Sequence, residues 1–134
     1  TTVYGNEDGE YNWTVLSSSD EGQTWQMVDE VIDTLNTSPA DIIVGHDDAL
    51  YVSGTIGTGL VVRRSPDGVT WTTVLNEAGF QSWGWPQLVK RGNLDTVAAY
   101  NSSTQDIKVY GSSDGVTWAL KENILSVTFG VRKI

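Results

Sequence analysis

Few residues of this chain have the types and spacing that chemistry needs. The only histidine, His46, precedes Asp47 and Asp48, and an imidazole beside carboxylates can ligate a metal ion. A polar turn between two strands explains the same three residues, and we favour it. Asn6 to Glu10 offers oxygen ligands that suit Ca²⁺, but it lacks the spacing of a known calcium loop, so an exposed acidic loop is favoured. We therefore expect no metal ion, no cofactor and no Ser-His-Asp nucleophile.

One long connection between predicted strands holds groups that could bind a ligand. It spans residues 78–86 and contains Gln81, Trp83 and Trp85. Flat aromatic faces with a nearby amide suit sugar rings, and the alternate spacing puts both tryptophans on one side of an extended segment. The competing interpretation, which we favour, is that these tryptophans fill a gap between neighbouring structural units. Arg91, at the end of a predicted strand, is a further ligand-binding candidate.

A short signature recurs three times and indicates which elements position these residues. Its defining residues are Ser18, Asp20, Gly22, Thr24 and Trp25, then Ser65, Asp67, Gly68, Thr70 and Trp71, then Ser112, Asp114, Gly115, Thr117 and Trp118. Asp and Ser side chains bond to backbone groups a few residues ahead, Gly supplies a positive φ, and Thr-Trp restarts a strand, so each copy predicts a structural hairpin turn. The aspartates recur every 47 residues, which matches a four-stranded propeller blade or kelch-like unit. We expect the three signature tryptophans to be core residues.

Residues that favour β-structure flank each signature, so each copy is expected to join two antiparallel strands. In the middle unit the predicted strands are residues 41–45, 49–53, 60–64 and 70–75, with a loop at 54–59. The third unit repeats this order over residues 88–122. Long connections are expected at residues 29–40, 76–87 and 122–132.

The pattern Ser-x-Asp-x-Gly-x-Thr-Trp resembles the Asp-box, the bacterial neuraminidase repeat of sialidase-like β-propellers. The first copy has the full spacing, and the other two lack one residue between Asp and Gly, a common shortened form in that family. The resemblance extends over the whole chain and implies an all-β fold of propeller blades, each with four antiparallel strands. It also implies that the box lies between the third and fourth strands of a blade, away from the ligand face. The connection at 78–86 would then lie on the ligand-facing rim.

The resemblance allows a sialidase activity to be weighed residue by residue. Sialidases hold the substrate carboxylate with three arginines and use a Tyr nucleophile with Glu and Asp partners. This chain has only Arg63, Arg64, Arg91 and Arg132, and no Arg-Ile-Pro motif precedes the first signature. Arg63 and Arg64 fall on a predicted third strand, whereas Arg91 and Arg132 lie at or just before first strands. We assign no catalytic residue, and a chain without enzymatic activity of its own is favoured.

The length of the chain limits the number of blades. A period of 47 residues in 134 gives about three, namely a partial blade at 1–40 and blades at 41–87 and 88–134. Propellers close with about four to eight blades, so we expect the ring to need further sequence or a second copy of the chain. Both ends of the sequence read as cut within a blade. The chain is therefore either part of a longer propeller or a homo-oligomer in which two copies give six blades and cover exposed edges.

Composition narrows the partners. A net charge of -9 and a pI near 4.3 make nucleic acid and anionic membrane surfaces poor partners. The apolar runs are short, so no membrane insertion is expected. The chain has no cysteine, and its acidic composition, rich in Thr, Ser and Gly, suits an extracellular, cell-surface or virion-associated protein.

Two classes of function follow from these observations. The favoured one is a non-catalytic recognition or structural β-propeller module on a secreted, cell-surface or viral particle, with a glycan or a protein as ligand. The alternative is a fragment of a larger sialidase-like glycoside hydrolase, whose catalytic groups lie on other blades. Because propeller folds host many functions, the fold alone does not decide between them.

Overall fold

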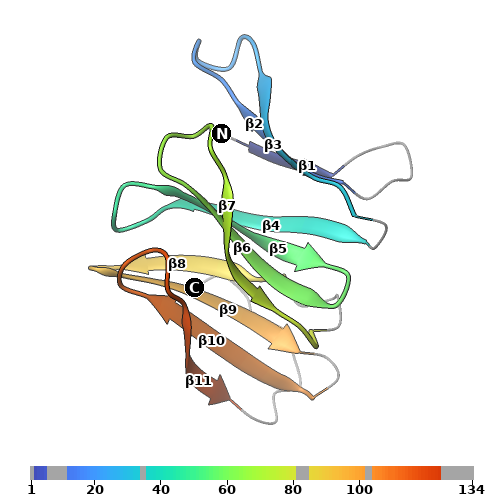
Figure 1. Ribbon diagram of the computed structural model, residues 1–134, viewed down its shortest axis with the longest axis vertical. Helices are drawn as coiled ribbons and strands as arrows, with labels where there is room; N and C mark the ends of the chain where they lie inside the picture. The colour runs from blue at the N-terminus through green and yellow to red at the C-terminus, as the bar shows by residue number, and fades with distance from the viewer. Residues whose placement is uncertain (1, 6–11, 34–35, 81–84, 102–103, 125–134) are drawn as a thin grey trace.

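The computed structural model describes residues 2–5, 12–33, 36–80, 85–101 and 104–124, and this part of the chain is all-β. Strands account for 62% of the structure, and no helix is present among the described residues, so none of them forms a helix able to cross a membrane. The strands form three antiparallel sheets, none of them closed. The sheets are stacked along the long axis of the molecule, with the first at the top of Figure 1 and the third at the bottom. The prediction of an all-β, antiparallel chain is confirmed.

Each sheet follows the order of its strands along the chain. The first sheet contains β1 (Thr2–Gly5), β2 (Trp13–Ser17) and β3 (Gln26–Val31). The second contains β4 (Thr37–Val44), β5 (Leu50–Ile56), β6 (Gly59–Ser65) and β7 (Thr72–Glu77). The third contains β8 (Gln87–Arg91), β9 (Leu94–Asn101), β10 (Asp106–Ser112) and β11 (Ala119–Ile124).

Three strands of the second sheet, β4, β5 and β6, are longer than the sequence predicted, and β7 has the predicted length but begins two residues later. β4 begins at Thr37 rather than at residue 41, because a bulge between Pro39 and Asp41 lets the pairing with β5 continue. β5 and β6 run on to Ile56 and from Gly59, so the predicted loop at 54–59 is wrong and a two-residue turn stands in its place. The predicted connection at 29–40 is likewise shorter, since β3 extends into it from one side and β4 from the other.

The core lies between the sheets, because neighbouring residues of the second sheet alternate between its two faces. At the first junction, between the first and second sheets, the buried residues are Trp13, Val15, Val52 and Val61. At the second junction, between the second and third sheets, they are Ala49, Tyr51, Leu60, Val62, Leu75, Phe80, Leu88, Val97, Ala99 and Tyr110. The second sheet is thus covered on both faces.

The three signature turns join β2 to β3, β6 to β7 and β10 to β11. In Figure 1 the first of these turns lies at the top of the molecule, and the second and third lie at the left together with the β4–β5 turn, whereas the β5–β6 turn lies at the right. The prediction that each signature joins two antiparallel strands is confirmed. We call the end of the sheets that carries the signature turns the signature end, and the end that carries the β5–β6 turn the opposite end.

Candidate functional site

Each signature turn is closed by its own aspartate. Asp67 Oδ1 accepts hydrogen bonds from the N–H groups of Val69 and Thr70 at 2.9 and 2.6 Å, and Oδ2 accepts one from the Thr70 hydroxyl at 2.8 Å. Asp20 and Asp114 accept corresponding bonds. Donors to a carboxylate favour its charged form, so the pKa of Asp67 and Asp114 is held well below the usual range and that of Asp20 is lowered to about 2. The three carboxylates are thus engaged by their own turns.

The tryptophans that end the signature turns differ in burial. Trp118 is half-buried and meets Tyr51 of the second sheet edge-on, with ring centroids 6.0 Å apart. Trp71 is also half-buried and packs against the core of the first junction. Trp25 is 46% exposed, and its indole N–H donates to the Gly22 carbonyl of its own turn. The expectation that all three are core residues is wrong for Trp25, because no described sheet covers its side of the first sheet.

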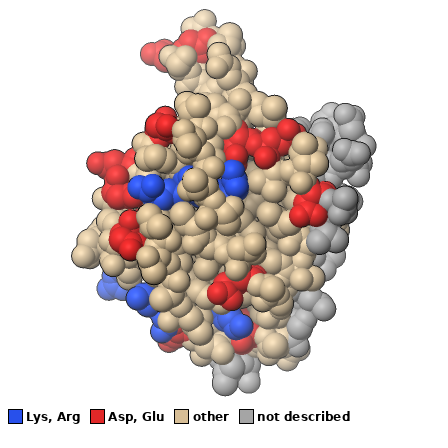
Figure 2. Space-filling view, viewed as in Figure 1, with Lys and Arg blue, Asp and Glu red and all other residues tan. Residues whose placement is uncertain are grey.

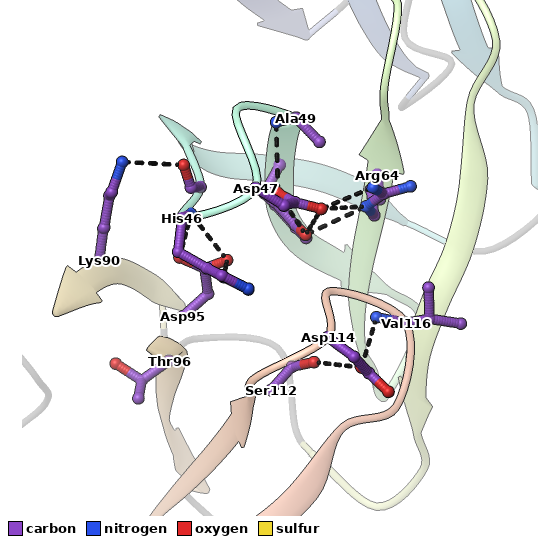
Figure 3. A network of polar contacts seen from close by, with 12 residues as sticks. His46, Asp47, Ala49, Arg64, Lys90, Asp95, Thr96, Ser112, Asp114 and Val116 are labelled. Carbon is purple, nitrogen blue, oxygen red and sulfur yellow. Dashed lines mark hydrogen bonds and ion pairs between the residues drawn. The ribbon is translucent and has the colours of Figure 1, made fainter. Parts of the chain in front are cut away.

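A longer turn in the second sheet reaches across to the third sheet. β4 and β5 are joined by residues 45–49, whereas β8 and β9 are joined by residues 92–93 alone. The backbone N–H of His46 donates to Asp95 Oδ1 at 3.1 Å, and His46 Nδ1 lies 2.6 Å from Asp95 Oδ2 (Figure 3). Asp95 is fully buried. Its hydrogen bond to the imidazole raises the pKa of His46 and so favours the charged ring.

Asp47, next to His46, forms an ion pair with Arg64 of its own sheet. Arg64 donates to Asp47 Oδ2 from Nη2 at 2.5 Å and from Nε at 3.0 Å (Figure 3). The Tyr51 hydroxyl donates to the same oxygen at 3.0 Å. Burial opposes the charge of Asp47, but these hydrogen bonds outweigh it and lower the pKa of the carboxyl. Burial raises the pKa of Tyr51 to about 12. We call His46, Asp47, Tyr51, Arg64 and Asp95 the polar cluster.

The polar cluster contains a set of possible metal ligands. His46, Asp47 and Asp95 each offer one ligand atom, and these atoms lie within 4.8 Å of one another. His46 Nδ1 is engaged by Asp95, however, and Asp47 by Arg64, whose fixed positive charge opposes the approach of a cation. Residues 46–48 form the turn that the sequence predicted. The geometry suits a charged contact between two sheets better than a metal centre.

Arg63 makes a second ion pair, at the first junction. Its Nε and Nη2 each donate to one carboxylate oxygen of Asp29 on β3, both at 2.5 Å. The Asp29 side chain is only 9% exposed and that of Arg63 only 15%, so the pair is largely removed from water. Arg63 and Arg64 are therefore both engaged by carboxylates of the protein rather than available to hold an anionic substrate.

The connection between β7 and β8 is anchored on both sides of its undescribed residues. Phe80 is buried, and the Gly79 carbonyl before it accepts a hydrogen bond from Asn101 Nδ2 at 2.8 Å. On the other side Pro86 is fully buried, and its carbonyl accepts one from the buried Ser53 hydroxyl at 3.1 Å. These contacts fix the backbone at the places where the connection leaves β7 and enters β8.

Trp85 stands next to the second of these anchors, and its side chain is 73% exposed. The expectation that Trp85 fills a gap between sheets is therefore wrong. Of the other predicted groups, Gln81 and Trp83 fall outside the described residues, as do Arg132 and the acidic run at residues 6–10. Arg91 is exposed at the far end of β8, and an extended strand of that length separates it from Trp85 by about 20 Å. The structure thus does not bring Arg91 and Trp85 together.

Sequence reasoning missed Asp95, the buried acid of the polar cluster. The strand that holds it alternates strictly between half-buried and buried positions, and Asp95 occupies a buried one. An acidic residue at an inward position of an alternating strand was the available signal, because such a group needs a partner.

Charge is mixed on the visible surface. On the face drawn in Figure 2, Lys and Arg lie among Asp and Glu and form no broad basic patch.

Comparison of the chain with models of known protein families, with curated proteins and with solved structures found no match.

Proposed function

We propose that this chain is a non-catalytic recognition module made of β-propeller blades, and that it contacts a glycan through the connection leading into β8. The observation that carries the proposal is the exposed indole of Trp85 beside a fixed backbone. A flat aromatic ring offers an apolar face to the C–H groups of a sugar ring, and its polar N–H stays available for a hydroxyl. Because Pro86 and its carbonyl are already held, little further ordering of the backbone is needed on binding.

The division between the two ends of the molecule supports this placement. At the signature end the aspartates, Arg64 and His46 are engaged in contacts within the protein. Trp85 lies at the opposite end, where connections between strands are supported by rigid sheets, as loops that bind ligands commonly are. A secreted, cell-surface or viral particle is the setting we propose for such a module.

We propose that the chain has no catalytic activity of its own, because its described arginines are paired within the protein or lie far from Trp85. A glycosidase of the sialidase type needs several arginines and carboxylates that converge on one substrate. Of the four arginines, Arg63 and Arg64 are paired with Asp29 and Asp47 on different parts of the stack. Arg91 lies at the signature end, away from Trp85.

The test is binding to a printed glycan array with Trp85→Ala and Trp85→Phe. We expect Trp85→Ala to weaken binding of the best sugar about tenfold or more, and Trp85→Phe to keep part of it, because the phenyl ring retains a flat apolar face. Val116→Ala is the matched control, since Val116 is 59% exposed on a signature turn at the other end. Adding Trp83→Ala to Trp85→Ala tests the second tryptophan of the predicted pair.

Circular dichroism of each variant shows whether the sheets are intact. Array binding by Trp85→Ala that equals binding by the parent, with an unchanged spectrum, would contradict the proposal. So would a loss of binding in Val116→Ala.

A further inference from the structure

The first sheet has a face that no described sheet covers. Val15 of β2 is fully buried at the first junction, so its neighbour Leu16 points to the other side of the sheet. Met27 pairs with Leu16 across the sheet and is 59% exposed. Trp25 adds a third large apolar side chain, 46% exposed. We call Leu16, Trp25 and Met27 the leading face.

The other two copies of the signature show what packs against a face of this kind. Trp118 of the third sheet packs on the second sheet, and Trp71 of the second packs on the first. Trp25 is the corresponding residue of the first sheet. Its exposed ring therefore marks the position at which a further sheet of the same kind would pack.

The third sheet has an outward face of matching composition. Leu88 and Val97 are buried at the second junction, so Val89, the neighbour of Leu88, points outward and is 44% exposed. Ile107 is half-buried, and Ile124, which pairs with it, is 41% exposed. We call Val89, Ile107, Val109 and Ile124 the trailing face.

The trailing face repeats a surface that already serves as an interface. Ile107 and Val109 lie 47 residues after Leu60 and Val62, the residues that the second sheet presents to the third. The trailing face of one copy therefore resembles the face that the second sheet presents to the third. It offers the leading face of another copy a surface of the kind that forms the second junction.

We propose that the leading face of one copy docks on the trailing face of a second copy, head to tail, as a further junction of the stack. The burial of large apolar side chains on both faces supplies the driving force. Each copy carries a net charge of -9, so repulsion opposes the contact and added salt strengthens it. Head-to-tail contacts close into a ring when the rotation allows, and two copies are the smallest such ring.

One acidic residue on the trailing side weakens this contact. Glu122 pairs with Val109, as Leu75 pairs with Val62 in the second sheet. Leu75 is buried at the second junction, whereas Glu122 is exposed. Glu122→Leu copies the second sheet and is expected to tighten self-association about tenfold.

Analytical ultracentrifugation over a range of protein concentrations tests the proposal. We expect the parent to exceed the 14.6 kDa of one chain as concentration rises. Met27→Glu and Ile124→Glu should each weaken association about tenfold or more, because each places a charge in an apolar contact. Val44→Glu is the matched control, since Val44 is 52% exposed and lies on β4 of the second sheet, which contributes to neither the leading nor the trailing face.

Mixing the two variants gives the sharpest result. Met27→Glu keeps an intact trailing face and Ile124→Glu keeps an intact leading face, so an equimolar mixture should form a complex of one copy of each. Trp25→Ala serves as a second disruption of the leading face, and circular dichroism shows that each variant is folded. A parent that stays at 14.6 kDa at its highest soluble concentration overturns the proposal. So does a mixture that fails to associate, or a loss of association in Met27→Glu but not in Ile124→Glu. Glycan binding is measured separately, so this proposal and the proposed function fail independently.

Discussion

The two junctions of the stack fill the same repeat positions with different chemistry. At the first junction Asp29, which pairs with Val15 on the sheet, binds Arg63. The corresponding residues at the second junction are Leu75, which pairs with Val62, and Tyr110, 47 residues after Arg63, and both are buried in one apolar cluster. An ion pair and an apolar pair therefore occupy the same place between sheets. This position between two sheets is therefore filled at both junctions, by charged side chains at the first and by apolar packing at the second.

The junctions also differ at the signature end. At the second junction Arg64, Asp47 and Tyr51 fill the space beside the third signature turn. Ser17, which occupies the position of Arg64 one unit earlier, is small, and the first junction is hollow there. The hollow is lined by Ser17, Ser19, Thr24, Gln26, Val28 and Val69. The same turn is thus tightly packed in one junction and loosely packed in the other.

The largest expected change in the free energy of unfolding comes from adding a methyl group to a glycine of these signature turns. Gly115 and Gly68 are matched glycines with φ of 75° and 76°, so alanine strains the backbone equally at both. A Cβ on Gly115 would overlap the Tyr51 hydroxyl and come within 2.7 Å of Asp47 Oδ2, whereas on Gly68 it would meet Leu50 at 3.7 Å. We expect Gly115→Ala to lower the free energy of unfolding by about 3 kcal/mol and Gly68→Ala by about 1 kcal/mol. Urea denaturation measures both, and equal losses would contradict the difference between the junctions.

The next effect comes from breaking the ion pair of the first junction. Arg63→Ala leaves Asp29, 9% exposed, without its cation and is expected to lower the free energy of unfolding by about 2 kcal/mol. The double variant Asp29→Leu with Arg63→Tyr copies the second junction and should return to within about 1 kcal/mol of the parent, because an apolar pair can replace a buried ion pair. A double variant less stable than Arg63→Ala would show that the two junctions are not interchangeable.

The smallest effect is a dependence of stability on pH at the second junction. Asp95 raises the pKa of His46 in the folded chain, and Asp47 and the Ser113 carbonyl favour the charged ring as well. Arg64 binds Asp47, and Lys90 donates to the Gly45 carbonyl beside the ring. The stabilisation is therefore fully present below the unfolded pKa of about 6.5 and is lost as pH rises through the higher folded value.

Urea midpoints measured from about pH 6 to about pH 9 test this dependence. They should fall with rising pH in the parent and fall less in His46→Asn, which keeps the backbone N–H that bonds Asp95. His46 is the only histidine, so no other imidazole contributes to the difference. Parallel pH profiles for the two proteins would contradict a role for the His46 charge.

The sequence predicted what depends on local pattern. The 47-residue spacing, the turn residues and the flanking β-formers led to antiparallel hairpins at the observed places. The starts of strands were less predictable, because the bulge near Pro39 extends β4 by a pairing that no local pattern shows. The pairing of His46 with Asp95 links residues 49 apart and depends on how far one turn reaches over the next sheet. The burial of Trp25 was mispredicted for a similar reason, since it depends on a neighbouring sheet and not on the turn.

The claim that ligand contact belongs to the end opposite the signature turns is tested most directly by the indole N–H signals of the six tryptophans. A ¹H–¹⁵N spectrum is recorded while the best sugar from the array is added, with single Trp→Phe variants to assign the signals. We expect the Trp85 signal to shift while those of Trp25, Trp71 and Trp118 stay in place. Shifts confined to the signature tryptophans, or an unchanged Trp85 signal at saturating sugar, would contradict the account.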